Sequence, residues 1–252
     1  MIDRKGEIKL SNNGQKMAIV RYNGCKDIDI KFEDGYVARN RTYTDFKLNR
    51  ITNYNYPSVF NMGIIGEDNE VGFSNSKSYR CWVNMLNRCY NEKYKKNKPT
   101  YNNCTVCKEW KYYKNFKSWF DKNYWEIDNC VMQLDKDILI KGNKEYNQSN
   151  CCFVDIRLNS LFTKDNAMRG DYPIGVQKRK DRKDNYMATC SIMNSKRHYI
   201  GSANNPIDAF NLYKQFKESY IKQVADEYKQ KYPNFPDKLY NAMYNYEVEI
   251  TD

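Results

Sequence analysis

The residues with the clearest capacity for chemistry lie together in the stretch 131–159. Asp135, Lys136 and Asp137 place an amine between two carboxylates, and four asparagine amides follow within the same stretch. A lysine acts as a base only if burial or a neighbouring cation lowers its pKa substantially. The carboxylates of Asp135 and Asp137 raise the pKa of Lys136 instead, so the triplet by itself does not supply a base.

The same stretch predicts two extended arms followed by a helix. The first arm leads from residue 131 into the aliphatic run Ile138–Ile140, and residues 141–143 form a turn signal because glycine and asparagine tolerate positive φ. Residues 151–154 are typical of a short buried strand or turn. Apolar residues from Ile156 onward begin a helical period. The predicted order is therefore a ββα unit.

This order resembles the HNH (His-Me finger) nucleases of phage homing endonucleases, which build a metal site on a ββα unit. The resemblance implies that Asp135 and Asn159 hold a divalent metal such as Mg²⁺, and that Asn150 orients the loop. Lys136 stands where that family has a histidine base, and the one histidine of the chain lies far along the sequence. In an active enzyme, Lys136 would stabilise the phosphate and Asp137 is the candidate base.

A wider block, from residue 79 to residue 153, resembles a set of phage-encoded proteins described as HNH-like. The matching segments are 79–90, 104–110, 115–119, 134–137 and 146–153. In that set an arginine or lysine commonly stands at the base position. The resemblance therefore implies that Lys136 is a trait of the set.

Four cysteines raise the possibility of a Zn²⁺ site. Cys104 and Cys107 have the C-x₂-C spacing of a zinc knuckle, and Cys151 with Cys152, or Cys130 with one of these, would have to complete it. Adjacent cysteines rarely both ligate one tetrahedral ion. Buried free thiols are the alternative that this spacing favours, and a disulfide framework is not expected in a reducing compartment.

The length and charge of the chain favour a multi-domain protein with a polyanionic partner. At 252 residues it can hold two or three small domains, and 42 Lys and Arg against 31 Asp and Glu give a net charge of +11. Such a balance most often accompanies nucleic-acid binding. A lysine-rich composition that follows from an AT-rich genome is the alternative explanation.

No apolar run is long enough to span a bilayer, and the first residues lack the apolar region of a signal peptide. We therefore expect a cytoplasmic protein without a membrane partner.

Residues 6–50 alternate between apolar and polar residues in the manner of short strands. Tight turns are predicted at 12–14, 23–24 and 34–35, each of which ends in glycine. This regular spacing predicts a small, SH3-like β-barrel module over residues 1–56. It also resembles a short β-module that precedes the same phage nuclease-like block. Residues 57–78 have no clear period and are expected to form a linker before a helix that begins at Lys77.

Residues 172–231 predict three strands and a long helix. The strands are expected at 172–180, 186–193 and 196–201, and Asn205-Pro206 is typical of a helix N-cap with proline at the first position. The buried face of this helix is predicted to consist of Phe210, Tyr213, Phe216 or Lys217, Tyr220, Val224 and Tyr228. A short terminal helix is expected near Leu239.

This segment resembles the APETALA2-type DNA-binding domain of plant ethylene-response factors and phage homing endonucleases. The matching residues are Gly175-Val176, Tyr186, Ala188, Tyr199-Ile200-Gly201 and Pro206 with Ala209, Phe210 and Tyr213. In that family the sheet lies in the major groove. The DNA-binding residues that the resemblance implies are Gln177, Lys178, Arg179, Lys180, Arg182, Lys183, Tyr186, Lys196 and Arg197. A solvated sheet face is the alternative.

We therefore expect an α+β protein with a small N-terminal β-barrel-like module, a central ββα-metal domain and a C-terminal three-stranded sheet with a helix. Its segments would be a β module over 1–56, a linker over 57–78, an HNH-like domain over 79–168 and an APETALA2-like domain over 169–252. The expected function is that of a phage or mobile-element protein of the homing-endonuclease type, which binds double-stranded DNA and cleaves it if the site is active. The alternatives are an inactive DNA-binding regulator and a phage effector that binds a host protein.

Overall fold

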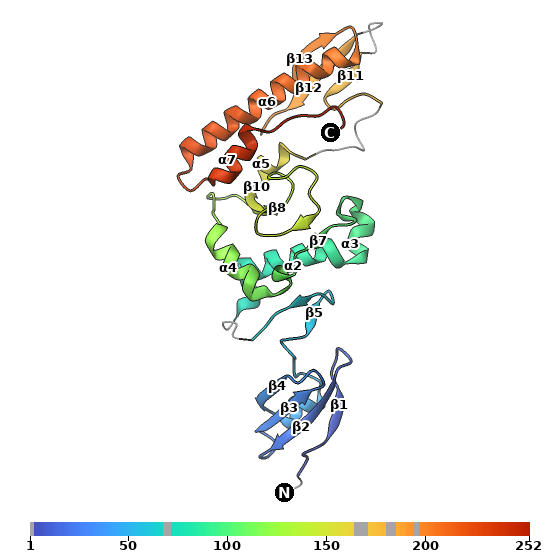
Figure 1. Cartoon of the computed structure of the whole chain (residues 1–252), viewed down its shortest axis with the longest axis vertical. Coiled ribbons are helices and arrows are strands. Elements are labelled where there is room, and N and C mark those ends of the chain that lie inside the picture. Colours follow the sequence, from blue (N-terminus) through green and yellow to red (C-terminus); the bar gives the residue numbers. More distant parts are fainter. Residues whose placement is uncertain (1–2, 68–71, 164–170, 180–184, 194–196) are drawn as a thin grey trace. The chain divides into compact units, whose positions relative to one another are not determined.

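The computed structural model describes residues 3–67, 72–163, 171–179, 185–193 and 197–252, and it has a mixed α+β architecture (Figure 1). The chain divides into two compact units, Met1–Trp119 and Phe120–Asp252. The division falls inside the segment 79–168 that the sequence predicts as one domain. Each unit is described by itself below.

The first unit begins with a four-stranded antiparallel sheet in the order β1-β2-β3-β4. Its strands are β1 (Ile8–Leu10), β2 (Lys16–Tyr22), β3 (Ile28–Phe32) and β4 (Val37–Arg41). The predicted turns are confirmed, since Gly14, Gly24 and Gly35 all have positive φ. Helix α1 (Tyr43–Lys47) follows, and the side chain of Thr42 caps it by accepting a hydrogen bond from Asp45 N at 3.0 Å.

The prediction that these strands form a small β-barrel is wrong. Each strand pairs only with its neighbours in sequence, so the described sheet is an open meander with β1 and β4 at its edges. The alternating residues Met17, Ile19, Ile28 and Ile30 are buried on one face, where Phe46 of α1 packs with them. A helix that covers one face of an open sheet buries the same apolar side chains that barrel closure would bury.

The remainder of the first unit is mainly helical. A short antiparallel pair lies within the predicted linker, and Gly63 of that pair packs so closely against Trp82 and Leu86 that a Cβ atom would lie 2.5 Å from Leu86 Cδ1. The elements are β5 (Pro57–Val59), β6 (Gly63–Ile64), η1 (Phe73–Asn75), α2 (Lys77–Tyr90), α3 (Glu92–Asn97), η2 (Pro99–Tyr101), β7 (Thr105–Val106), η3 (Glu109–Lys111) and α4 (Tyr113–Asn123), within which the division between the units falls.

The helix predicted from Lys77 is confirmed as α2. Its apolar residues Trp82, Met85, Leu86 and Cys89 recur at helical spacing and are all buried. The indole N–H of Trp82 donates a hydrogen bond to Trp110 O at 2.7 Å, which satisfies the polar atom of this buried ring.

The second unit contains two groups of antiparallel strands and the helices α5, α6 and α7 (Figure 1). The first group pairs β8 (Met132–Asp135) with β10 (Cys152–Asp155) and leads into α5 (Ile156–Ser160); β9 (Glu145–Tyr146) lies between the two strands in sequence. The second group is the sheet β11 (Val176–Lys178), β12 (Tyr186–Ser191) and β13 (Arg197–Ala203), which is followed by α6 (Pro206–Lys231) and α7 (Asp237–Tyr244).

Helix α6 packs against one face of the sheet β11-β12-β13. Val176, Ala188 and Cys190 of the strands form a buried cluster with Phe210 and Tyr213 of the helix. Asn205 caps α6 as predicted, since its Oδ1 atom accepts a hydrogen bond from Asp208 N at 2.9 Å. The predicted three strands and helix are therefore confirmed, although β11 is shorter than the predicted segment 172–180.

Candidate metal centre and nucleic-acid interface

Asp135 is the last residue of β8 and lies directly across from Cys152 of β10. The neighbouring pair, Leu134 and Phe153, points to the other face of the strands, where both side chains are buried. There Trp125 donates its indole N–H to Phe153 O at 2.9 Å. This packing holds β8 against β10 and so fixes the position of the Asp135 backbone, from which the carboxylate extends.

Strand β8 ends at Asp135, and the Asp135 carboxylate stabilises the bend that follows. Its Oδ1 atom accepts hydrogen bonds from Asp137 N at 2.7 Å and from Ile138 N at 2.8 Å. The prediction that Ile138–Ile140 continues a strand is therefore wrong: these residues form a bend that begins where the Asp135 side chain, rather than a strand partner, takes the amides of Asp137 and Ile138. Burial raises the pKa of Asp135, and the two backbone hydrogen bonds act in the opposite direction.

Lys136 is buried, with 5% of its side chain exposed, whereas half of the Asp137 side chain is exposed. The Lys136 ammonium donates to Asp137 Oδ1 at 2.6 Å, to Asp137 Oδ2 at 2.7 Å and to Asn143 O at 2.9 Å. An ammonium group has three N–H donors, and these three acceptors use all of them. In this arrangement Lys136 holds the loop closed and offers no donor to a phosphate.

Asn143 braces the loop between β8 and β10. Its Nδ2 atom donates to Lys136 O at 2.9 Å and to Glu145 O at 2.7 Å. Its Oδ1 atom accepts from Glu145 N at 3.1 Å and from Asn150 Nδ2 at 3.3 Å. The sequence identified Asn143 as a turn residue only. It gave no sign that this amide connects both ends of the loop, and Asn150 reaches the loop through it.

Asn159 of α5 lies against β8. Its Nδ2 atom donates a hydrogen bond to Gln133 Oε1 at 2.7 Å. Gln133 and Asp135 are two residues apart on one strand, so their side chains leave the same face. The two residues that the HNH resemblance implies as metal ligands, Asp135 and Asn159, therefore lie over the same face of β8. Gln133 joins them as a residue that the sequence did not indicate.

The chemistry of this donor set fits Mg²⁺. Within the described part of the chain, Asp135 Oδ2 and Asn159 Oδ1 take part in no hydrogen bond, so each residue keeps an oxygen for a ligand. Mg²⁺ prefers oxygen ligands and commonly takes one or two from protein while it keeps water and substrate oxygens. Asp135 and Asn159 would hold such an ion.

The four cysteines considered for Zn²⁺ remain a prediction. Cys104, Cys151 and Cys152 are buried and Cys107 is half-buried. Burial raises the pKa of the Cys151 and Cys152 thiols, which favours their protonated form. Among the residues that the structure describes, no group of three or more His, Cys, Asp or Glu side chains is placed to hold a metal ion.

The face of the C-terminal sheet that points away from α6 carries mainly polar side chains. Cross-strand partners share a face, and the register pairs Gln177 with Met187, Thr189 with Tyr199, and Ser191 with Arg197. A bulge between Ala188 and Thr189 shifts the register and keeps the last two pairs on this face. Below, the free face means the face formed by Gln177, Met187, Thr189, Ser191, Arg197, Tyr199 and Ser202, of which Ser191, Arg197 and Tyr199 are exposed and Thr189 is buried.

Not every residue implied as DNA-binding lies on the free face. Tyr186 packs against the core beneath α6, and its strand partner Lys178 places its ammonium 5.8 Å from the centre of that ring. Arg179 follows β11 directly, and its N–H donates to Asn185 O at 2.9 Å. Four more of the implied residues lie outside the described ranges: Lys180, Arg182, Lys183 and Lys196. His198 is exposed, and its ring stacks on Phe216 with ring centres 4.9 Å apart.

Comparisons with protein-family models, with curated proteins and with solved structures give no match for this chain. In the described part of the chain, no helix combines the length and apolar character needed to cross a bilayer.

Proposed function

We propose that this protein binds double-stranded DNA through the free face of the sheet β11-β12-β13. The observation that supports the proposal is the difference between the two faces of this sheet. Val176, Ala188 and Cys190 are buried under α6, whereas the exposed side chains of Arg197 and Tyr199 stand on the opposite face. The helix thus covers one face of the sheet, and the exposed side chains on the other face are available to a partner.

The residue types on the free face suit a duplex. Arginine can form two hydrogen bonds with a guanine edge, and glutamine can do the same with adenine, so Arg197 and Gln177 can read bases. The net charge of +11 favours association with the phosphate backbone. By sequence, Lys180, Arg182, Lys183 and Lys196 add positive charge within the same segment.

A gel-shift titration of the full chain at two salt concentrations tests this proposal. Arg197→Ala should reduce the slope of log affinity against log salt by about one if Arg197 contacts a phosphate. It should cost about 1–3 kcal/mol and relax preference at one base pair if Arg197 contacts a guanine. Lys222→Ala, on the exposed side of α6, is the matched control and should leave affinity unchanged. Absence of binding at low salt, or binding that does not depend on salt, contradicts the proposal and favours a protein partner.

A second candidate function is metal-dependent hydrolysis of DNA by the ββα unit. The arrangement of Asp135 and Asn159 over one face of β8 favours it, because each residue keeps an oxygen atom for a cation. A bound Mg²⁺ would stabilise the charge that develops on the phosphate oxygens. Asp135 would bind the ion, Asn159 would bind and orient it, and Gln133 would orient Asn159. Lys136 and Asp137 hold each other in the loop, and the half-exposed carboxylate of Asp137 is the candidate base.

Plasmid nicking with Mg²⁺ or Mn²⁺ tests the second candidate. Asp135→Ala and Asn159→Ala should abolish nicking, whereas Asp128→Ala, which removes an exposed carboxylate in the same unit, should not. Equal nicking by wild type and Asp135→Ala would reject a catalytic role for this site. DNA binding without any metal-dependent nicking by the wild type would identify a DNA-binding regulator.

A further inference from the structure

Lys217 is a buried lysine of α6. It follows Tyr213 by four residues and precedes Ile221 by four, so all three side chains lie on the helix face that packs inward. Only 7% of Lys217 is exposed, and burial lowers its pKa. Within the described residues, its ammonium forms no hydrogen bond or ion pair. A buried amine without a partner is costly in a protein, and this one therefore indicates a ligand.

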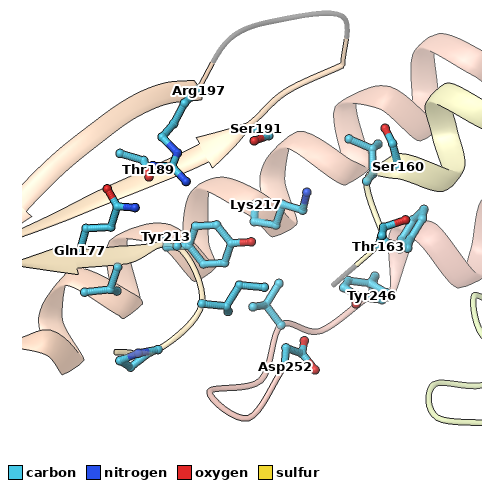
Figure 2. A pocket seen from close by; sticks show the side chains of 17 residues that line it. Ser160, Thr163, Gln177, Thr189, Ser191, Arg197, Tyr213, Lys217, Tyr246 and Asp252 are labelled. Carbon is cyan, nitrogen blue, oxygen red and sulfur yellow. The ribbon is translucent and has the colours of Figure 1, made fainter. Parts of the chain in front are cut away.

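The ammonium of Lys217 points into a cavity of about 210 Å³ at the edge of the C-terminal sheet where β11 begins (Figure 2). Figure 2 shows the Tyr213 hydroxyl pointing into the same space, with Arg197, Thr189 and Gln177 on the strands beside it. The hydroxyl of Ser191 also lines the cavity. The cavity therefore has polar groups from α6 and from all three strands.

The charges around the cavity favour an anion. Lys217 and Arg197 are both cationic, and within the described residues Arg197 forms no ion pair. Asp252 is a carboxylate in the lining, and it pairs with Lys141, whose Nζ atom lies 2.7 Å from Asp252 Oδ1 and 3.2 Å from Glu249 Oε2. Lys217 and Arg197 are the two cations of the lining that pair with no carboxylate among the described residues.

We propose that the Lys217 cavity binds a small phosphorylated molecule, with the phosphate group held between Lys217 and Arg197. A tetrahedral oxyanion accepts hydrogen bonds from several directions, and the donors here come from different elements: Lys217 from α6, Thr189 and Ser191 from β12, and Arg197 from β13. A planar carboxylate would use fewer of them. The volume suits a small ligand, since pockets for drug-sized molecules start at about 300 Å³.

A phosphate of duplex DNA is the other source of the same chemistry. Arg197 also belongs to the free face that we propose for DNA. Lys217, however, is almost completely enclosed. A phosphate of a duplex is linked on both sides to the sugars of the backbone, so it cannot reach an amine at that depth. The cavity therefore favours a free phosphate or phosphomonoester.

Thermal unfolding of the full chain with added inorganic phosphate tests the proposal, with chloride at matched ionic strength as reference. Phosphate should raise the melting temperature of the wild type in a saturable way, because a ligand that binds only the folded state stabilises it. Lys217→Met should weaken phosphate binding at least tenfold, and Arg197→Gln should weaken it several-fold. Lys222→Met, an exposed lysine on the same helix, should bind phosphate as the wild type does.

Lys217→Met should also fold well without phosphate, because it replaces a buried cation by an apolar side chain of similar length. If it nevertheless fails to fold, Arg197→Gln at an exposed position gives the same test. No saturable phosphate effect in the wild type, or an equal effect in Lys217→Met, would overturn the proposal.

DNA titration separates the two sources of phosphate. If the cavity takes a small molecule, Lys217→Met binds duplex DNA as the wild type does. Weaker DNA binding by Lys217→Met, together with displacement of phosphate by a duplex, would overturn the assignment to a small molecule. Failure of the DNA proposal leaves the phosphate measurement unaffected, because that measurement contains no DNA.

Discussion

Lys136 donates hydrogen bonds to both carboxylate oxygens of Asp137, at 2.6 and 2.7 Å, although the two residues are adjacent in sequence. The remaining N–H of the ammonium goes to Asn143 O at 2.9 Å. The resemblance to HNH nucleases places Lys136 where that family has its histidine base. In this structure Lys136 is instead a buried cation whose hydrogen bonds hold the loop between β8 and β10 together. The use of all three of its donors within the loop decides what it can do.

Lys136→Met should therefore destabilise the protein. The methionine keeps most of the apolar stem but leaves Asn143 O without its donor, and the expected loss is about 1–3 kcal/mol in the free energy of unfolding. Lys144→Met changes an exposed lysine of the same loop and should stay within about 0.5 kcal/mol of the wild type. Urea denaturation followed by circular dichroism measures both. A neutral Lys136→Met would contradict the structural role.

Local patterns in the sequence predicted the hairpin turns of the first unit, helix α2 and the N-cap of α6, because glycine conformation, helical spacing and capping depend on near neighbours. The same reasoning failed at Ile138–Ile140. There the aliphatic run predicts a strand, but the Asp135 side chain accepts hydrogen bonds from the amides of Asp137 and Ile138, at the point where the run begins. The pattern of apolar residues alone does not show that a side chain will compete with a strand partner for these backbone amides.

The candidate sites depend on contacts that are distant in sequence. Asn159 and Gln133 are 26 residues apart, and nothing in either segment indicates their hydrogen bond. For Lys217, helical spacing allowed either Phe216 or Lys217 on the buried face. The structure places Lys217 inward, and Phe216 stacks on His198 at the side of the sheet. A buried lysine breaks the rule that apolar residues fill the core, so sequence reasoning could not prefer it.

Asp29 of β3 should make the first unit sensitive to acid. Arg21 donates to both of its carboxylate oxygens, at 2.8 and 2.9 Å, and lowers the pKa of Asp29 from 3.8 to about 2. Because the folded-state pKa is below the unfolded value, this stabilisation is present above about pH 4 and is lost as the pH falls towards 2. NMR titration of the Asp29 carboxyl group and melting temperatures between pH 2 and pH 6 measure it.

Asp29→Asn should melt at a lower temperature than the wild type at pH 6, with a cost of about 1–3 kcal/mol, because Arg21 loses a charged acceptor. The difference between the two proteins should shrink as the pH approaches 2. Asp128→Asn, at an exposed position, should follow the wild type at every pH. A constant difference across the whole range would show that the Asp29 charge is not the cause.

Gly175 and Gly142 form a matched pair for a test of packing beneath α6. Both have positive φ, at 77° and 76°, so alanine should cost about 1–2 kcal/mol of backbone strain at either site. At Gly142 an added Cβ meets no atom within 4 Å. At Gly175 it would lie 2.2 Å from Tyr213 Cδ2, against the ring of a buried side chain. Gly175→Ala should therefore lose about 1–3 kcal/mol more than Gly142→Ala. Urea denaturation of the two full-length variants measures the difference. Equal losses would mean that Tyr213 moves aside without cost and that the contact between β11 and α6 is loose.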